Sequence, residues 1–210
     1  MTEPQSAPHG NGLRFGPVGA DWVHLVIDMQ RMFAEPTAWE TPWLRRILPN
    51  VETLVALAPE RTIFTRFVPP ESPAKAPGTW ARYYERWPMM TREALDPALI
   101  DLVPALARHV PPARVLDKPV YSPWLGTMLH QNLQNAGITT LVISGAETEV
   151  CVLAAVMGAI DLGYRVILPT DALCSSADET HDAMLAIYES RFGTQVETLT
   201  TLDLVAALAR

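Results

Sequence analysis

Apolar residues gather in short runs that are separated by longer, periodic segments. Residues 22–27, WVHLVI, are almost continuously apolar and are followed by Asp28. Shorter or more mixed runs follow at 61–67, 114–118, 141–143, 165–168 and 195–199. Runs without regular polar alternation are typical of parallel strands that are covered on both faces. The pattern therefore predicts six strands in one buried parallel sheet.

Between these runs, apolar residues recur with the period of an α-helix. In residues 42–57 they fall at Leu44, Ile47, Leu48, Val51, Leu54, Val55 and Leu57, which predicts a helix with one apolar face. Further helices are predicted over 98–107, 121–135, 152–162, 178–191 and 201–208. Strands that alternate with helices predict an α/β fold over residues 19–210, with a single doubly wound six-stranded parallel sheet and helices on both faces.

Two segments depart from this alternation. Residues 1–18 are rich in Pro, Gly and Ser, and we expect a loose N-terminal arm there. Residues 68–97 are rich in Pro and aromatic residues, with Trp80, Tyr83, Tyr84 and Trp87 at near-helical spacing. A short amphipathic helix packed on the body and a lid that walls a pocket are equally compatible with this segment.

Composition and charge restrict the class of protein. The chain has 210 residues, of which 49% are hydrophobic and 19% charged, and these proportions are those of a globular domain. The net charge of −7 and the lack of a basic run argue against nucleic-acid or anionic-membrane partners. Two cysteines form no disulfide framework, and no apolar stretch has the length of a signal peptide core or a membrane span. We expect a cytoplasmic protein that acts on a small molecule.

The sequence around Cys151 gives the clearest indication of chemistry in the chain. The apolar run 141–143 is followed by Gly145, a short polar turn and the long apolar segment 152–162. Cys151 is therefore expected at a helix N-terminus, where unpaired amides and the helix dipole favour a reactive thiolate. A cysteine at an arbitrary position is more often a small buried hydrophobe. The strand-to-helix turn favours a nucleophile here.

Two charged residues are expected at the same edge of the sheet. Asp28 follows the run 22–27, and Lys118 ends the run 114–118 before Pro119. In open α/β sheets, ligands bind where the carboxyl ends of the strands meet. Taken singly, Asp28 is as well explained by a cap or turn role, and Lys118 by a solvated surface charge.

Five motifs in register give the chain a family resemblance over residues 20 to the end. They are Val26-Ile27-Asp28-Met29-Gln30 with Phe33, Lys118-x-x-Tyr121-Ser122-Pro123-Trp124, Gly145-x-x-Thr148-x-x-Cys151, Gly163-Tyr164-x-Val166 and Asp171-Ala172. In this order they resemble the isochorismatase-like cysteine hydrolase superfamily. Each motif is weak alone, but their common order is specific.

The resemblance implies a triad with Cys151 as nucleophile, Asp28 as base and Lys118 as electrostatic partner. It also implies a cis peptide bond between Ala146 and Glu147, and an oxyanion hole made by the backbone amides of Glu147 and Cys151. These roles agree with the chemistry, because a neutral thiol is a modest nucleophile and needs a carboxylate to take its proton. A nearby ammonium then stabilises the thiolate and the carboxylate together.

The sequence departs from the nicotinamidases of this superfamily. Those enzymes hold a metal through an Asp-x-His pair shortly after the second strand and a further histidine. Here the corresponding segment is Thr65-Arg66-Phe67-Val68-Pro69, and His109, His130 and His181 have no binding spacing. We therefore expect no metal and no other cofactor. The aromatic residue after Tyr121-Ser122 is usually phenylalanine in the family and is Trp124 here.

These observations predict a metal-independent, cysteine-dependent hydrolase. It would cleave a C–N bond of a small amide, ureido or lactam substrate through a thioester. The competing hypotheses are a vinyl-ether hydrolase of the isochorismatase type, a thiol-redox protein that uses Cys151 with Cys174, and a catalytically silent binding protein.

The candidate substrate pocket is made mainly of aromatic residues. Its members would be Phe33, Arg66, Trp80, Tyr84, Trp87, Tyr121 and Trp124. Arg66 is a candidate for binding a substrate carboxylate, although a structural ion pair explains it better. Glu147 is a candidate for contacting a substrate amine, or else a turn residue whose backbone alone matters.

The resemblance also predicts a homodimer or homotetramer, because superfamily members commonly assemble in this way. The aromatic segment 68–97 and the apolar C-terminal helix are the surfaces expected to be covered, since contiguous exposed apolar patches are rare on monomers. Light scattering at micromolar protein concentration checks this prediction. A monomeric mass would contradict it.

Overall fold

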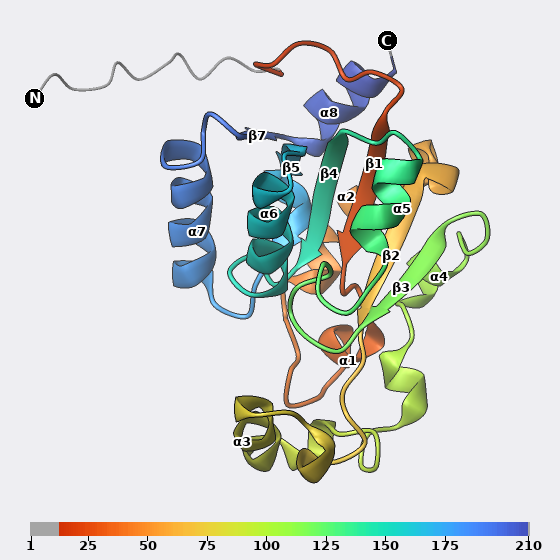
Figure 1. Cartoon of the computed structure of the whole chain (residues 1–210), viewed down its shortest axis with the longest axis vertical. Coiled ribbons are helices and arrows are strands. Elements are labelled where there is room, and N and C mark those ends of the chain that lie inside the picture. Colours follow the sequence, from red (N-terminus) through yellow and green to blue (C-terminus); the bar gives the residue numbers. More distant parts are fainter. Residues whose placement is uncertain (1–12, 210) are drawn as a thin grey trace, which may run out of the picture.

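The computed structural model describes residues 13–209 and contains a parallel sheet (Figure 1). Its strands are β1 (Trp22–Ile27), β2 (Thr62–Phe67), β3 (Arg114–Lys118), β4 (Thr140–Ala146), β5 (Arg165–Pro169), β6 (Leu173–Cys174) and β7 (Val196–Leu199). The strand order is β3-β2-β1-β4-β5-β7, and every pairing between these strands is parallel. The six predicted strands are confirmed. The additional strand β6 has two residues and pairs with the end of β4, so it is too short to leave a pattern.

Helices cover both faces of this sheet. One face is packed by α2 (Leu44–Leu57), α4 (Pro104–Ala107) and α8 (Thr201–Leu208), and the other by α5 (Leu129–Asn135), α6 (Cys151–Asp161) and α7 (Asp178–Ser190). Each face has its own buried cluster, because alternate residues of each strand point to opposite sides. None of the helices within residues 13–209 is both long and apolar enough to cross a membrane.

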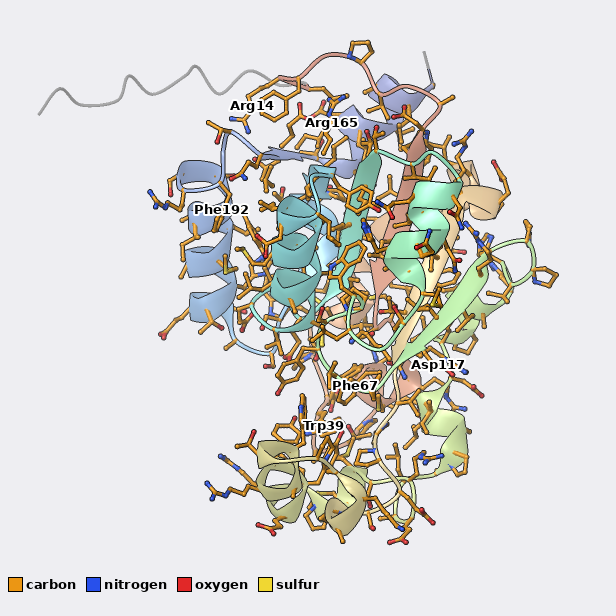
Figure 2. All side chains as sticks on the ribbon, in the orientation of Figure 1. Arg14, Trp39, Phe67, Asp117, Arg165 and Phe192 are labelled. Atoms are coloured by element: carbon orange, nitrogen blue, oxygen red, sulfur yellow. The ribbon has the colours of Figure 1, made fainter. Side chains whose placement is uncertain are left out.

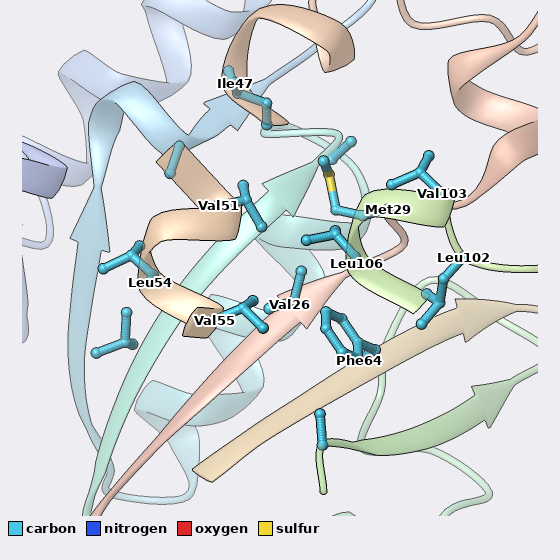
Figure 3. Packing of buried hydrophobic residues seen from close by; sticks show 14 of the residues in the cluster. Val26, Met29, Ile47, Val51, Leu54, Val55, Phe64, Leu102, Val103 and Leu106 are labelled. Carbon is cyan, nitrogen blue, oxygen red and sulfur yellow. The ribbon is translucent and has the colours of Figure 1, made fainter. Parts of the chain in front are cut away.

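The regularly spaced apolar residues of helix α2 pack against the sheet. Leu44, Ile47, Val51, Leu54 and Val55 are buried and lie on one side of the helix. Figure 3 shows several of these side chains above strand residues such as Val26 and Phe64, with Leu106 of α4 beside them. The period seen in the sequence is therefore the face that the helix presents to the sheet.

Two predicted helices are shorter than expected. Residues 98–107 divide into the 3-10 turn η4 (Pro97–Ile100) and α4, because Pro104 must begin a helix and cannot continue one. Within 121–135 only α5 is helical. The preceding residues contain Pro123 and Gly126, whose positive φ of 70° is outside the helical range.

The aromatic segment 68–97 forms a compact extension beyond the carboxyl edge of the sheet (Figure 1). It contains η2 (Pro73–Lys75), α3 (Thr79–Arg86) and η3 (Pro88–Met90), and α3 is the short amphipathic helix that was one of the two alternatives for this segment. The segment packs against Met32 and Phe67, next to the short helix α1 (Arg31–Ala34). It is attached to the body by an apolar cluster.

The described part of the N-terminal arm is bound to the sheet. Arg14 donates to the carbonyl oxygen of Val196 at 2.7 Å, and Arg165 donates to the carbonyl oxygens of Gly16 and Pro17 at 2.7 and 3.0 Å (Figure 2). Arg165 also pairs with the buried carboxylate of Glu197 at 2.7 Å. The loose arm expected over residues 1–18 is therefore wrong for residues 13–18, and residues 1–12 lie outside the described part.

Gly145 allows β1 and β4 to approach closely at the edge where Asp28 lies. Its φ is 112°, and a Cβ atom there would overlap the carbonyl oxygen of Ile27 on the neighbouring strand. Ile27 and Gly145 are register partners. A side chain at position 145 would therefore separate the two strands beside Asp28.

Gly145→Ala should lower the free energy of unfolding by at least about 3 kcal/mol, because it combines backbone strain with overpacking. The matched control is Gly137→Ala, where φ is 67° and a Cβ would meet nothing within 4 Å. That variant should lose only about 1–2 kcal/mol, the cost of a left-handed backbone. Urea denaturation of both variants measures the difference. Equal losses would contradict the role assigned to the strand contact.

Candidate active site

Three buried side chains converge at the carboxyl edge of the sheet. Asp28 directly follows β1, Lys118 is the last residue of β3, and Cys151 is the first residue of α6. Their side chains are almost fully buried. The Lys118 ammonium donates to Oδ2 of Asp28 at 2.7 Å and to the carbonyl oxygen of Val120 at 3.2 Å. The sheet places a carboxylate, an ammonium and a thiol in one desolvated region.

Strand β2 lies between β1 and β3, so the Lys118 side chain has to reach across its end to Asp28. The ammonium passes the ring of Phe67 with Nζ 5.1 Å from the ring centroid. This is a cation–π distance, and such a contact stabilises an ammonium that has left water. Phe67 is therefore part of the surroundings that keep Lys118 charged.

Asp28 is held in one orientation by its own backbone and by Thr65. Its φ is 50°, which is uncommon for a residue with a side chain. The Thr65 hydroxyl donates to Oδ1 of Asp28 at 2.5 Å and accepts from the Asp28 amide at 3.1 Å. One oxygen of the carboxylate is thus bound by Thr65 and the other by Lys118.

The turn before α6 presents unused backbone donors beside Cys151. The peptide bond between Ala146 and Glu147 is cis, as the resemblance implied. The amides of Val150 and Val152 both donate to the carbonyl oxygen of Glu147. The amides of Glu147 and Cys151 donate to no other backbone group within residues 13–209. Two free amides near a thiol are the donors that an oxyanion hole requires.

The local charges set the protonation of the thiol. Burial raises the pKa of Cys151 well above its ordinary value, and the carboxylate of Asp28 raises it further, whereas Lys118 acts in the opposite direction. Burial and Asp28 therefore act against the thiolate that the helix N-terminus would favour. Burial lowers the pKa of Lys118, but the charges of Asp28 and Cys151 raise it overall. Lys118 stays an ammonium, and the thiol needs a base.

A cavity of about 420 Å³ lies against Lys118, between β3 and the aromatic segment. Its walls include Trp80 and Tyr84 of α3, together with Pro119 and Val120 after β3. Trp80 and Tyr84 were predicted pocket residues, and both line this cavity. Its size is that of a site for a small molecule.

The family model of the isochorismatase domain matches residues 23–200, which is most of the chain. The chain belongs to the isochorismatase family. Among curated proteins it is 32% identical over 166 residues to a probable inactive nicotinamidase of Arabidopsis thaliana, At3g16190, covering 76% of this chain and 83% of that protein. It is also 35% identical over 106 residues to the ureidoacrylate amidohydrolase RutB of Methylobacterium radiotolerans, covering 50% of this chain but only 40% of that one.

Solved structures of the isochorismatase family share this fold. A cysteine hydrolase from Pseudomonas syringae pv. phaseolicola matches with a TM-score of 0.80 at 20% identity, covering 97% of this chain and 99% of that one. A pyrazinamidase from Pyrococcus horikoshii, solved in complex with zinc, matches with a TM-score of 0.66 at 25% identity, covering 86% and 99%. The relatives named here are hydrolases by name, and the family assignment is that of a hydrolase.

Arg66 is not free to bind a substrate. Its guanidinium donates to both carboxylate oxygens of Asp117 at 2.7 and 2.9 Å, and to Asp101 at 3.1 Å. It is not among the residues that line the cavity. As a pocket residue Arg66 is therefore wrong, and the structural ion pair is the role it has.

Trp124 is also outside the cavity and packs against helix α6 of this isochorismatase-family protein. Its indole donates to the carbonyl oxygen of Ala155 at 2.9 Å, and its ring stacks on Tyr164 at 5.7 Å between centroids. The ring lies so close to Gly158 that a Cβ atom at that position would overlap it. Trp124 was expected in the pocket, and this was wrong because the irregular 121–128 segment turns it toward α6.

The other predicted aromatic residues form the framework of the cavity. Tyr121 packs against Trp80 with centroids 4.8 Å apart, and burial followed by the charge of Cys151 raises its pKa, which places it near the nucleophile. Phe33 stacks on Trp39 at 6.2 Å. Trp87 belongs to the apolar cluster that attaches the aromatic segment. Tyr121, Phe33 and Trp87 are not among the residues that line the cavity.

Three important residues were not predicted from the sequence. Thr65 orients Asp28. Gln30 is buried and donates to the carbonyl oxygens of Phe67 and Ile100 at 3.1 and 2.7 Å, which ties the end of β2 to the following loops. Trp39 contacts the rings of Phe67, Tyr83 and Tyr84, and in Figure 2 it lies between the sheet and α3. Gln30 belongs to the motif that contains Asp28, and this position is the only sequence signal for it, whereas Trp39 has no signal beyond its aromatic character.

The side chain of Glu147 is used within the protein. Its carboxylate accepts from the amide of Ser176 at 3.1 Å, and that of Glu149 accepts from Ser175 at 2.6 Å. The turn before Cys151 is thereby connected to the loop before α7. Contact of Glu147 with a substrate amine is less well supported than its role in the turn.

The donor set of this chain does not fit a metal of the nicotinamidase type. Among residues 13–209, no group of three or more His, Cys, Asp or Glu side chains is placed to hold a metal ion. His130 bonds to Tyr164, His181 to Thr148, and His109 lies 3.9 Å from Glu52. None of these three histidines belongs to a group that could hold a metal among the described residues.

Removal of the charge of Lys118 and removal of the charge of Asp28 should shift the reactivity of the Cys151 thiol in opposite directions. Lys118→Ala should raise the pKa of Cys151 further and move the midpoint of its alkylation to higher pH by about 1 to 3 units, whereas Asp28→Asn should move it to lower pH. The pH dependence of iodoacetamide labelling, read by mass spectrometry of the Cys151 peptide, measures both shifts.

Cys174 is the internal control for these experiments. Burial raises its pKa first, followed by Glu147 and Glu149, and neither triad residue contributes. Its labelling should therefore be unchanged in both variants. Shifts in the same direction for Lys118→Ala and Asp28→Asn would contradict the arrangement of charges.

Proposed function

We propose that this protein is a cysteine-dependent hydrolase that cleaves a C–N bond in a small amide, ureido or lactam substrate. The observation that carries the proposal is the buried ion pair of Lys118 and Asp28 beside the thiol of Cys151. Two buried charges are costly to maintain unless they do chemistry or fix the fold. Their position at the ligand-binding edge of the sheet favours chemistry.

In the proposed reaction Asp28 takes the proton of the Cys151 thiol as the sulfur attacks the substrate carbonyl carbon. The carbonyl oxygen becomes an anion and accepts hydrogen bonds from the amides of Glu147 and Cys151. The protonated Asp28 then gives its proton to the departing nitrogen, and the C–N bond breaks to leave a thioester. Water, deprotonated by Asp28, attacks the thioester, and Cys151 recovers its proton as the acid leaves.

Lys118 would hold the charge balance through these steps. Its ammonium stabilises Asp28 as a carboxylate before proton transfer, and the Cys151 thiolate as that proton leaves. Because Lys118 also bonds to the carbonyl oxygen of Val120, it does not need to move between these states. Thr65 keeps the second oxygen of Asp28 fixed, so that a single oxygen faces the proton.

The relatives support an amide substrate in general terms only. Those with the printed names ureidoacrylate amidohydrolase and maleamate amidohydrolase act, by those names, on linear amides or ureido compounds. The chain matches less than half the length of each. We extend only the shared reaction, hydrolysis of a C–N bond, to this protein.

A catalytically silent binding protein is the second candidate. The Arabidopsis relative is called probable inactive, so loss of activity is a real possibility in the family. In this chain Asp28, Lys118 and Cys151 are all present, Lys118 is paired with Asp28, and Lys118 lines the cavity, which favours hydrolysis. A vinyl-ether reaction without a nucleophilic cysteine stays an alternative, and a redox role is the least supported because Cys151 and Cys174 are both free.

Cys151→Ser and Asp28→Asn should each lower the rate of ammonia release from an accepted amide by on the order of 10⁴-fold, as removal of triad members does elsewhere. The screen uses a panel of amides, ureas and hydantoins, and a thioester on the Cys151 peptide should be trapped by acid quench and mass spectrometry. Cys174→Ala is the matched control and should keep its activity. Dialysis against a chelator should leave the rate unchanged.

Two results would count against this function. Wild-type rates in both triad variants would show that the site is misassigned. Turnover that needs a stoichiometric divalent metal would refute the metal-independent mechanism.

A further inference from the structure

The cavity beside Lys118 has an inner and an outer part. Lys118 and Tyr84 are buried and form its inner wall, whereas Lys75 and Arg92 are exposed and form its mouth. Between them the lining is mainly apolar, with Trp80 and several prolines. A molecule that fills the cavity would therefore have its inner end near the triad and its outer end near two cations.

The hydroxyl of Tyr84 has no partner within the described part of the chain. The side chain is only 1% exposed, and its oxygen makes no hydrogen bond there. Buried hydroxyls are nearly always paired, so an unpaired one on a residue that lines a cavity points to a ligand. Burial and then the charges of Tyr121 and Cys151 raise the pKa of Tyr84, so its hydroxyl stays protonated and lies within electrostatic reach of the nucleophile.

The charges that line the cavity leave a positive surplus at its mouth. Asp117 is its one acidic lining residue, and Arg66 binds both oxygens of that carboxylate. Lys118 is paired with Asp28. Lys75 and Arg92 form no ion pair with any carboxylate of residues 13–209. The cavity is thus neutral inside and cationic outside.

We propose that the substrate of this site is an amide that carries an anionic group, such as a carboxylate, at the end opposite the scissile bond. The anion binds Arg92 and Lys75, the apolar middle lies against Trp80, and the Tyr84 hydroxyl donates a hydrogen bond to the inner, amide end. This assignment rests on the proposed hydrolysis and adds the class of substrate. The surplus of unpaired cations distinguishes it from a site for a neutral amide.

Binding is measured first, without turnover, on the Cys151→Ala variant. The probes are succinamate, adipamate and terephthalamate, each compared by calorimetry with the neutral amide of the same skeleton, which is butyramide, hexanamide or benzamide. At least one acidic probe should bind about tenfold more tightly than its neutral partner, the effect of one charge-assisted hydrogen bond. Arg92→Gln should remove that preference.

Arg82→Gln is the matched control. Arg82 is an exposed arginine of α3 outside the cavity lining, so the substitution makes the same change in net charge in the same segment. It should leave the preference intact. If Arg92→Gln and Arg82→Gln lost the preference for acidic probes equally, the effect would be one of net charge, and the proposal would be overturned. Equal binding of acidic and neutral probes by the Cys151→Ala variant would overturn it as well.

Tyr84→Phe tests the inner end of the cavity. Because the hydroxyl has no partner in the protein, its removal should leave the thermal midpoint unchanged or higher, while the affinity for the preferred probe falls about tenfold. A fall in the midpoint with unchanged affinity would show a structural hydroxyl and overturn this contact.

The binding and turnover experiments fail separately. Arg92-dependent binding of an acidic amide that is never hydrolysed would keep the substrate class and refute the hydrolase. Cys151-dependent hydrolysis of neutral and acidic amides at equal kcat/KM would keep the hydrolase and refute the substrate class.

Discussion

The buried pairing of Lys118 with Asp28 constrains the rest of the site. Each charge has left water, and removing one partner of such a pair typically costs about 3–5 kcal/mol because the other remains buried and unpaired. The sheet has to bring the ends of β1 and β3 into register across β2 for the pair to form. The ring of Phe67, the hydroxyl of Thr65 and the carbonyl of Val120 then complete the surroundings of the two charges. The site is therefore a property of the sheet edge more than of any one loop.

The thiol depends on this pair in turn. Asp28 and Lys118 act on Cys151 with opposite signs, and burial adds to the effect of Asp28. In the proposed mechanism this balance favours a proton on sulfur before the substrate arrives, and the same carboxylate then accepts that proton. A resting thiol is also less open to oxidation than a thiolate. In the proposed mechanism, the thiol of Cys151 is therefore protected from oxidation while its base lies beside it.

The sequence predicted the sheet and the positions of the three candidate triad residues because both leave local patterns. Apolar runs located six strands to within a few residues, and the motifs around Asp28, Lys118 and Cys151 each follow a strand end. Side-chain direction in irregular segments leaves no such pattern. Trp124 follows a proline and precedes Gly126, and only the fold decides that it faces α6 and not the cavity. An arginine at position 66 gives the same sequence pattern whether its side chain binds a substrate or Asp117. Thr65 acts through a partner 37 positions away, which no local pattern records.

The contact between Trp124 and Gly158 makes the residue that is acceptable at one position depend on the residue at the other. Helix α6 carries the nucleophile at its first residue, and the indole occupies the space that a side chain at position 158 would need. A substitution at either position changes what the other can accept, since a residue larger than glycine requires a smaller or displaced ring at 124. In this chain, a smaller ring at position 124 would leave room for a side chain at position 158, whereas the indole of Trp124 leaves none. The aromatic residue at position 124 therefore limits which substitutions helix α6, which begins at Cys151, can accept at position 158.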